Sequence, residues 1–159
     1  MPIPFFLLAA VLTVADQVVK YLVRLNIPLG QRLSFLPGVM DLTFVQNTGA
    51  AFSLLEEHTW LLTLLSGAAA VVLAVLLVKK IFSHWSGQLA LGLLLGGAVG
   101  NFIDRLLLGY VTDMFAVTFV NFPVFNVADI GVVVGGVLLC VHVILFMKDG
   151  DKKEGGACS

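Results

Sequence analysis

Four apolar stretches, each close to the length that crosses a bilayer, constrain this chain more than any other feature. A helix needs about 20 mainly apolar residues to cross the hydrocarbon core of a membrane. The four stretches run over about residues 4–23, 59–78, 88–108 and 127–147. The sequence therefore predicts four transmembrane helices.

The composition supports a membrane protein. Of the 159 residues, 59% are hydrophobic and 12% are charged. A soluble domain carries about 25% charged and about 45–50% apolar residues. A chain of this length has no interior large enough for the surplus, so we expect an all-α membrane protein with one domain over residues 1–148. Residues 149–159 should form a disordered cytoplasmic tail, and the net charge of −1 gives no indication of a nucleic-acid partner.

Basic residues predict the orientation of the helices. Lys79 and Lys80 lie between the second and third stretches, and three lysines lie within residues 148–153. Loops rich in Lys and Arg stay in the cytoplasm. Both termini are therefore expected to be cytoplasmic, and the segments over about residues 24–58 and 109–126 are expected to face outward.

The first outer segment has the pattern of short strands. Arg32–Leu36 and Met40–Val45 show partial alternation of polar and apolar residues on either side of Pro37–Gly38. Alternation around such a turn is typical of a β-hairpin. We expect a small sheet in this loop, at the membrane surface.

Several charged residues lie in or beside the predicted helices, where lipid makes them costly. Asp16 and Lys20 are four residues apart and share a helix face. Asn101, Asp104 and Arg105 share a face near the outer end of the third helix. Each group could be purely structural, as a neutralised pair or as a contact to loop carbonyls or lipid phosphates, and the pattern by itself leaves this open.

Two further aspartates flank the second outer segment. Asn126 is a suitable N-cap, which would make Asp129 the third residue of the fourth helix and explain it as a capping residue. Asp113 has no such explanation, because no basic residue is near it in the sequence. If the third and fourth helices are antiparallel, the two carboxylates can converge.

Two converging carboxylates suit peptide hydrolysis without a metal. They share a proton, so that one can activate water while the other protonates the substrate. Other chemistries lack their motifs: the sequence has no HExxH, CxxC or GxSxG spacing. We therefore expect an aspartic peptidase that works without a metal.

Five sequence blocks, taken in order, resemble those of the bacterial lipoprotein signal peptidase family, also called signal peptidase II. They are Asp16–Lys20 (DQVVK), Asn47–Ser53 (NTGAAFS), Gly96–Arg105 (GGAVGNFIDR), Val111–Met114 (VTDM) and Phe125–Asp129 (FNVAD). The resemblance implies four transmembrane helices with a surface β-cradle. It also implies cleavage of prolipoproteins just before a cysteine that carries a diacylglyceryl group. No metal or organic cofactor is implied.

The resemblance assigns roles to particular residues. Asp113 and Asp129 are expected to be the catalytic pair. The residues expected to bind substrate or support the site are Asp16, Lys20, Asn47, Gly49, Asn101, Arg105 and Asn126. The implied partners are diacylglyceryl prolipoproteins, membrane lipids and globomycin-type inhibitors, and the protein is expected to be a monomer. Its place would be the bacterial inner membrane, with the active site at the extracytoplasmic face.

One departure and two alternatives accompany this interpretation. Met114–Phe115–Ala116 follows Asp113, where many family members carry a second acidic residue, so the shape of that loop is not carried over. A small transporter or assembly subunit could use Asp16–Lys20 and Arg105 as a polar pathway. Other intramembrane aspartic proteases carry a GxGD block, which neither aspartate has.

The first outer loop, with few charges and Gly49, is expected to close over the substrate.

Overall fold

Four long helices and a small sheet make up the computed structural model, which describes residues 2–49 and 59–146. All four helices are long and apolar enough to span a membrane, which confirms the predicted fold class. The tail over residues 149–159 and residues 50–53 of the second sequence block lie outside the described residues. The elements are α1 Ile3–Asn26, β1 Arg32–Leu36, β2 Met40–Asn47, α2 Thr59–Val78, α3 Trp85–Leu108, β3 Val111–Val117 and α4 Val127–Phe146.

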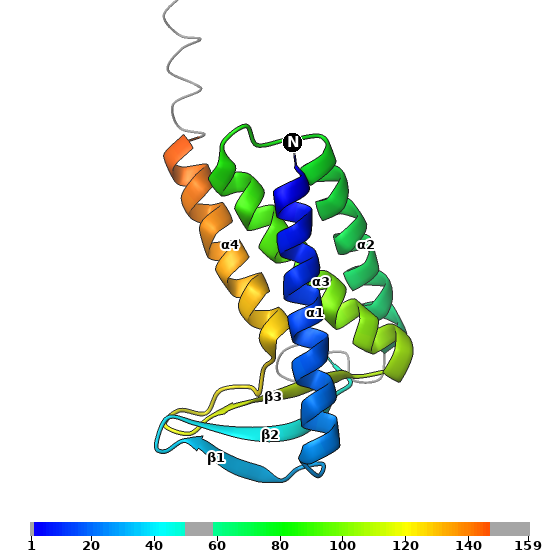
Figure 1. Cartoon of the computed structure of the whole chain (residues 1–159), viewed down its shortest axis with the longest axis vertical. Helices are drawn as coiled ribbons and strands as arrows, with labels where there is room; N and C mark the ends of the chain where they lie inside the picture. The colour runs from blue at the N-terminus through cyan, green and yellow to red at the C-terminus, as the bar shows by residue number, and fades with distance from the viewer. Residues whose placement is uncertain (1, 50–58, 147–159) are drawn as a thin grey trace, which may run out of the picture.

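The helices form a bundle in which α3 packs against the other three (Figure 1). The beginning of α1, the connection from α2 to α3 and the end of α4 lie at one end of this bundle. An apolar cluster of Ala9, Leu77, Leu91 and Leu95 joins α1, α2 and α3. The opposite end of the bundle, where α1 and α3 finish and α4 begins, carries the sheet.

Glycines allow α3 to lie close to its neighbours. A Cβ atom at Gly96 would lie 2.8 Å from the carbonyl oxygen of Ala9, and one at Gly135 would lie 2.9 Å from that of Ala90. Backbones that approach this closely gain van der Waals contact, which drives helix association in lipid. The glycines therefore fix the positions of α1 and α4 on α3.

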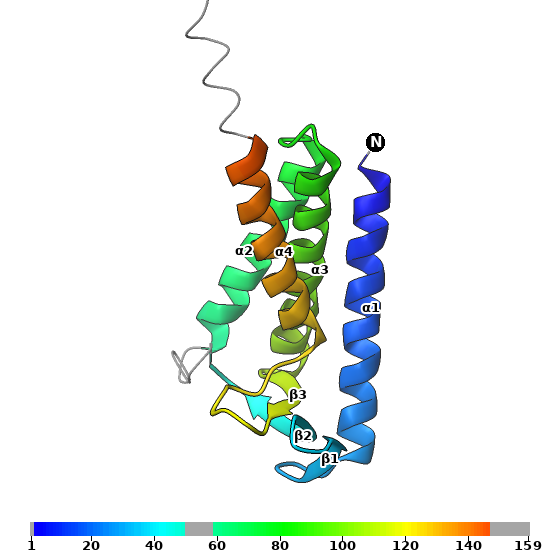
Figure 2. The same ribbon diagram turned by 90° about the vertical axis from the view of Figure 1, so that its left-hand side faces the viewer.

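The sheet is antiparallel with strand order β1-β2-β3 (Figure 2). β1 and β2 form the predicted hairpin, and Gly38 has a φ of 75° at its turn. β3 comes from the second outer segment, so the sheet is not confined to the first outer loop as the sequence suggested. In the register of β2 with β3, Val45 pairs with Asp113 and Asn47 pairs with Val111.

The connection from β3 to α4 folds back onto the sheet. Phe125 N–H donates to the Phe115 carbonyl at 3.1 Å, and Phe115 N–H donates to the Phe125 carbonyl at 2.9 Å. These bonds bring Asn126 beside β3. The start of α4 is thus placed next to Asp113, although the two are separated by a loop.

Candidate active site

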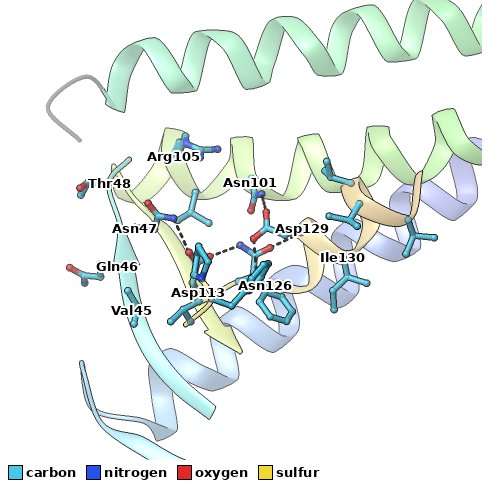
Figure 3. A pocket seen from close by; sticks show the side chains of 18 of the residues that line it. Val45, Gln46, Asn47, Thr48, Asn101, Arg105, Asp113, Asn126, Asp129 and Ile130 are labelled. Atoms are coloured by element: carbon cyan, nitrogen blue, oxygen red, sulfur yellow. Dashed lines mark hydrogen bonds between the residues drawn. The ribbon is translucent and has the colours of Figure 1, made fainter. Parts of the chain in front are cut away.

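A cavity of about 850 Å³ lies where the sheet meets α3 and α4 (Figure 3). Apolar side chains, among them Phe122, Val124, Ile130 and Val133, form much of its wall. Its polar lining includes Asn47, Asn101, Arg105, Asp113, Asn126 and Asp129. The structure therefore brings the two predicted catalytic aspartates into one cavity, together with four of the residues predicted to support them.

Asp113 lies on β3 and is only 2% exposed. Asn47 lies on the neighbouring strand, diagonally opposite Asp113 and on the same face of the sheet. Its Nδ2 donates to Asp113 Oδ2 at 2.9 Å, and Asn126 Nδ2 donates to Asp113 Oδ1 at 2.6 Å. Burial raises the pKa of Asp113 to about 6, and the charge of Asp129 adds to the increase, while the hydrogen bonds from Asn47 and Asn126 oppose it.

Asp129 lies in the first turn of α4 and forms a reciprocal cap with Asn126. The backbone N–H of Asp129 donates to Asn126 Oδ1 at 2.9 Å, and the backbone N–H of Asn126 donates to Asp129 Oδ2 at 3.1 Å. This geometry confirms the predicted N-cap. Asn101 Nδ2 donates to the other oxygen, Asp129 Oδ1, at 2.8 Å. Asp129 can therefore cap α4 and line the cavity at the same time.

Three asparagine amides are oriented in the same way. In each, a fixed donor engages Oδ1, so the NH₂ group must point toward a carboxylate. The donors to Oδ1 are the backbone N–H of Gly49 for Asn47, at 3.0 Å, and Lys20 Nζ for Asn101, at 2.9 Å. For Asn126 the donor is the N–H of Asp129. Both carboxylates are thus surrounded by neutral amides of defined orientation.

Arg105 brings a positive charge to the cavity without pairing closely to either aspartate. No carboxylate oxygen of the described residues lies within 4.0 Å of its guanidinium nitrogens. Its Nε is buried and has no hydrogen-bond partner among the same residues. A guanidinium in this state can bind a carbonyl oxygen or a phosphate from a ligand.

Asp16 and Lys20 were predicted as site residues, but they do not line the cavity. They lie behind it as a buried pair, both 0% exposed, with Lys20 Nζ 2.8 Å from Asp16 Oδ2. Asp104 belongs to the same layer, 3.3 Å from Lys20 Nζ, and was not among the predicted site residues. A signal for it existed, because an aspartate within a membrane helix needs a partner.

The arrangement suits acid–base chemistry by two carboxyl groups. Asp113 and Asp129 share Asn126 as a hydrogen-bond partner, and the raised pKa of Asp113, about 6, lets that residue gain and lose a proton closer to neutral pH than an ordinary carboxyl group does. Across residues 2–49 and 59–146, no three His, Cys, Asp or Glu side chains form a group that could hold a metal ion.

Known proteins share both the sequence and the fold. Residues 8–145 match the profile of a family described as signal peptidase (SPase) II. A lipoprotein signal peptidase from Enterococcus faecalis is 43% identical over 151 residues, which cover 95% of this chain and 92% of the relative. One from Lactiplantibacillus plantarum is 39% identical over 140 residues, covering 88% and 93%.

A solved structure of a bacterial membrane enzyme, determined in meso at 2.3 Å resolution, superposes with a TM-score of 0.84. It is 28% identical, and the match covers 98% of this chain and 94% of that one. These matches exclude the alternative of a non-enzymatic transporter or assembly subunit. The chain belongs to the signal peptidase II family and is a membrane-spanning peptidase.

Proposed function

We propose that this protein is a lipoprotein signal peptidase that cleaves prolipoproteins just before a diacylglyceryl-modified cysteine, with Asp113 and Asp129 as its catalytic pair. The observation that carries the proposal is the placement of both carboxyl groups in one cavity, joined through Asn126. The names of the relatives supply the substrate class.

The surroundings of the two carboxyl groups suggest different resting states. Asp113 is buried and its pKa is raised to about 6, so it takes up a proton more readily than an ordinary carboxyl group does. Asp129 lies in the first turn of α4, where free backbone N–H groups and the helix dipole favour a negative charge. Asp129 therefore starts the reaction as the base, and Asp113 starts it as the acid.

The reaction proceeds in two balanced steps. In the first, a water oxygen attacks the carbonyl carbon of the scissile peptide, Asp129 takes a proton from that water, and Asp113 gives its proton to the carbonyl oxygen. In the second, the C–N bond breaks, Asp129 returns its proton to the leaving nitrogen, and Asp113 takes a proton from one hydroxyl of the intermediate. The products are a carboxylic acid and an amine, and both aspartates regain their starting states.

The cavity wall suits a lipid-modified substrate. Ile130 and Val133 line the cavity and are also 44% and 64% exposed on the surface of α4. An acyl chain attached to the substrate cysteine can leave the cavity along this helix without leaving lipid. Arg105, whose Nε has no hydrogen-bond partner among the described residues, supplies a donor for a peptide carbonyl or an ester oxygen. Globomycin-type inhibitors are proposed to compete for the same cavity.

The cavity end of the bundle is proposed to face away from the cytoplasm, with both termini inside and the bundle in the bacterial inner membrane. Lys79 and Lys80 follow α2 at the far end from the cavity, and such basic residues remain cytoplasmic. The protein is proposed to act as a monomer, because both carboxyl groups of the pair come from the same chain.

Cleavage of a purified diacylglyceryl prolipoprotein in detergent tests the proposal. Wild type should cleave this substrate and spare the same protein without its lipid, while Asp113→Asn and Asp129→Asn should each lower kcat by at least about 10³-fold. Asp41→Asn, an identical change on β2 outside the cavity lining, is the matched control and should cleave normally. Retained cleavage by either site variant, or no cleavage by folded wild type, would overturn the proposal.

A further inference from the structure

The residue before each proposed catalytic aspartate is held by a second, buried carboxylate. The backbone N–H of Thr112 donates to Asp104 Oδ2 at 2.9 Å. The backbone N–H of Ala128 donates to Asp16 Oδ1, also at 2.9 Å. Asp16 and Asp104 are 0% and 1% exposed and do not line the cavity. Each proposed catalytic aspartate is thus anchored through the backbone N–H of the residue before it.

A single ammonium group joins these two anchors. Lys20 Nζ lies 2.8 Å from Asp16 Oδ2 and 3.3 Å from Asp104 Oδ2, and it donates to Asn101 Oδ1 at 2.9 Å. An ammonium has three N–H donors, so these three partners use all of them. The third partner matters for the site as well, because Asn101 donates to Asp129.

Packing leaves this layer little room to shift. A Cβ atom at Gly100 would lie 2.7 Å from Asp16 Oδ2, so only glycine lets α3 approach the carboxylate. Gln17 Nε2 donates both to the Gly100 carbonyl and to Asp104 Oδ1, each at 3.0 Å. α1 is therefore fixed to α3 at the level of the anchors.

We infer that Lys20 is a positioning residue: it ties the backbone segments that carry Asp113 and Asp129 to one buried point and so sets the separation of the two carboxyl groups. This inference rests on the proposed function. Both carboxyl groups must reach the same water and carbonyl, and a misplacement of about 1 Å can cost about 10²-fold in rate.

The competing explanation is that the buried ion pair only stabilises the bundle. The double variant Lys20→Met/Asp16→Asn separates the two explanations, because it removes one charge of each sign. Asp104 keeps Gln17 as a hydrogen-bond donor and Arg24 NH1 at 3.9 Å. Replacing a buried ion pair with uncharged residues of similar volume is often close to neutral for stability.

Kinetics of the purified double variant should show a fall in kcat of about 10²-fold and a change in KM of less than about threefold. The pH profile gives a second readout. Since the charge of Lys20 lowers the pKa of Asp113, its removal should move the limb of the profile that belongs to Asp113 to higher pH.

The matched control is Thr13→Val, which removes a hydrogen bond of 3.1 Å from α1 to the Gly96 carbonyl without touching the anchors. It should lower only the thermal midpoint and leave the pH profile in place. Two results together would overturn the inference. The folded double variant would have wild-type kcat and an unshifted pH profile, and Asp113→Asn would be inactive. If Asp113→Asn also cleaves, the proposed function itself fails.

Should the double variant not fold, Lys20→Gln gives the same readouts, because its amide keeps two of the three donors. Its kcat should fall by a smaller factor, again with little change in KM. Wild-type kcat together with an unshifted profile in this variant would overturn the inference equally.

Discussion

The molecule contains two pairs of buried or partly buried aspartates, and their surroundings differ in kind. Asp16 and Asp104, behind the cavity, both contact the ammonium of Lys20. Asp113 and Asp129, in the cavity, accept hydrogen bonds from amide groups, and no Lys or Arg nitrogen of the described residues lies within 4.0 Å of them.

This difference separates the carboxylates that join the helices from the carboxylates that are proposed to react. A cation beside a carboxylate stabilises its charged form. Neutral amides orient a carboxyl group without supplying a full opposite charge, so its protonation can change during a reaction. The proposed acid–base reaction needs the second arrangement, and we infer that the first arrangement positions it.

The largest predicted difference between the two pairs is in stability. Asp104→Asn should lower the free energy of unfolding by about 3–5 kcal/mol, because it removes a partner from a buried ion pair. Asp129→Asn should lower it by less than about 1 kcal/mol, since an asparagine can still cap α4. Unfolding of both variants in mixed detergent would measure the difference, and equal losses would contradict the distinction between the two pairs.

A smaller effect concerns the pH dependence of stability. The pKa of Asp113 is about 6 in the folded protein against an ordinary 3.8, so the folded state binds this proton more tightly than the unfolded state does. The resulting stabilisation is complete below pH about 4 and is lost as the pH rises through about 6. Its size is at most about 3 kcal/mol.

Asp113→Asn removes this dependence. The stability of the variant relative to wild type should therefore rise between pH about 4 and about 6 and then level off. Unfolding of both proteins across this range is the measurement. Parallel curves for the two proteins would show that Asp113 titrates in its ordinary range.

The smallest predicted effect tests the amides themselves. Asn47→Leu removes a hydrogen bond that lowers the pKa of Asp113, so the limb of the pH–rate profile that belongs to Asp113 should move upward by about one pH unit. Asn26→Leu, at the exposed end of α1, is the matched control and should leave the profile unchanged. An unshifted profile in the Asn47 variant would mean that this amide only orients the carboxyl group.

Much of the fold followed from local sequence patterns. The apolar stretches predicted the four helices, and the alternation around Pro37–Gly38 predicted β1 and β2. Asn126 with Asp129 predicted the start of α4. β3 was missed because nearly all of its residues are buried, so Val111–Val117 has no polar-apolar alternation to reveal a strand.

The site was predictable only in part for a different reason. Asp113 and Asp129 could be found from their blocks, but the contacts that hold them join distant parts of the chain. Gln17 bonds Asp104 across 87 positions, and Asp16 bonds the N–H of Ala128 across 112. No local pattern records such pairings, so the role of Asp104 became visible only in the folded bundle.

The reciprocal cap between Asn126 and Asp129 has a consequence for the biosynthesis of the enzyme. One carboxyl group of the proposed catalytic pair, and the amide that orients the other, belong to the start of the last helix. A nascent chain whose first three helices have entered the bilayer therefore has Asp113 but no partner for it. With Asp113 and Asp129 as the proposed catalytic pair, activity should therefore begin only after the fourth helix has joined the bundle.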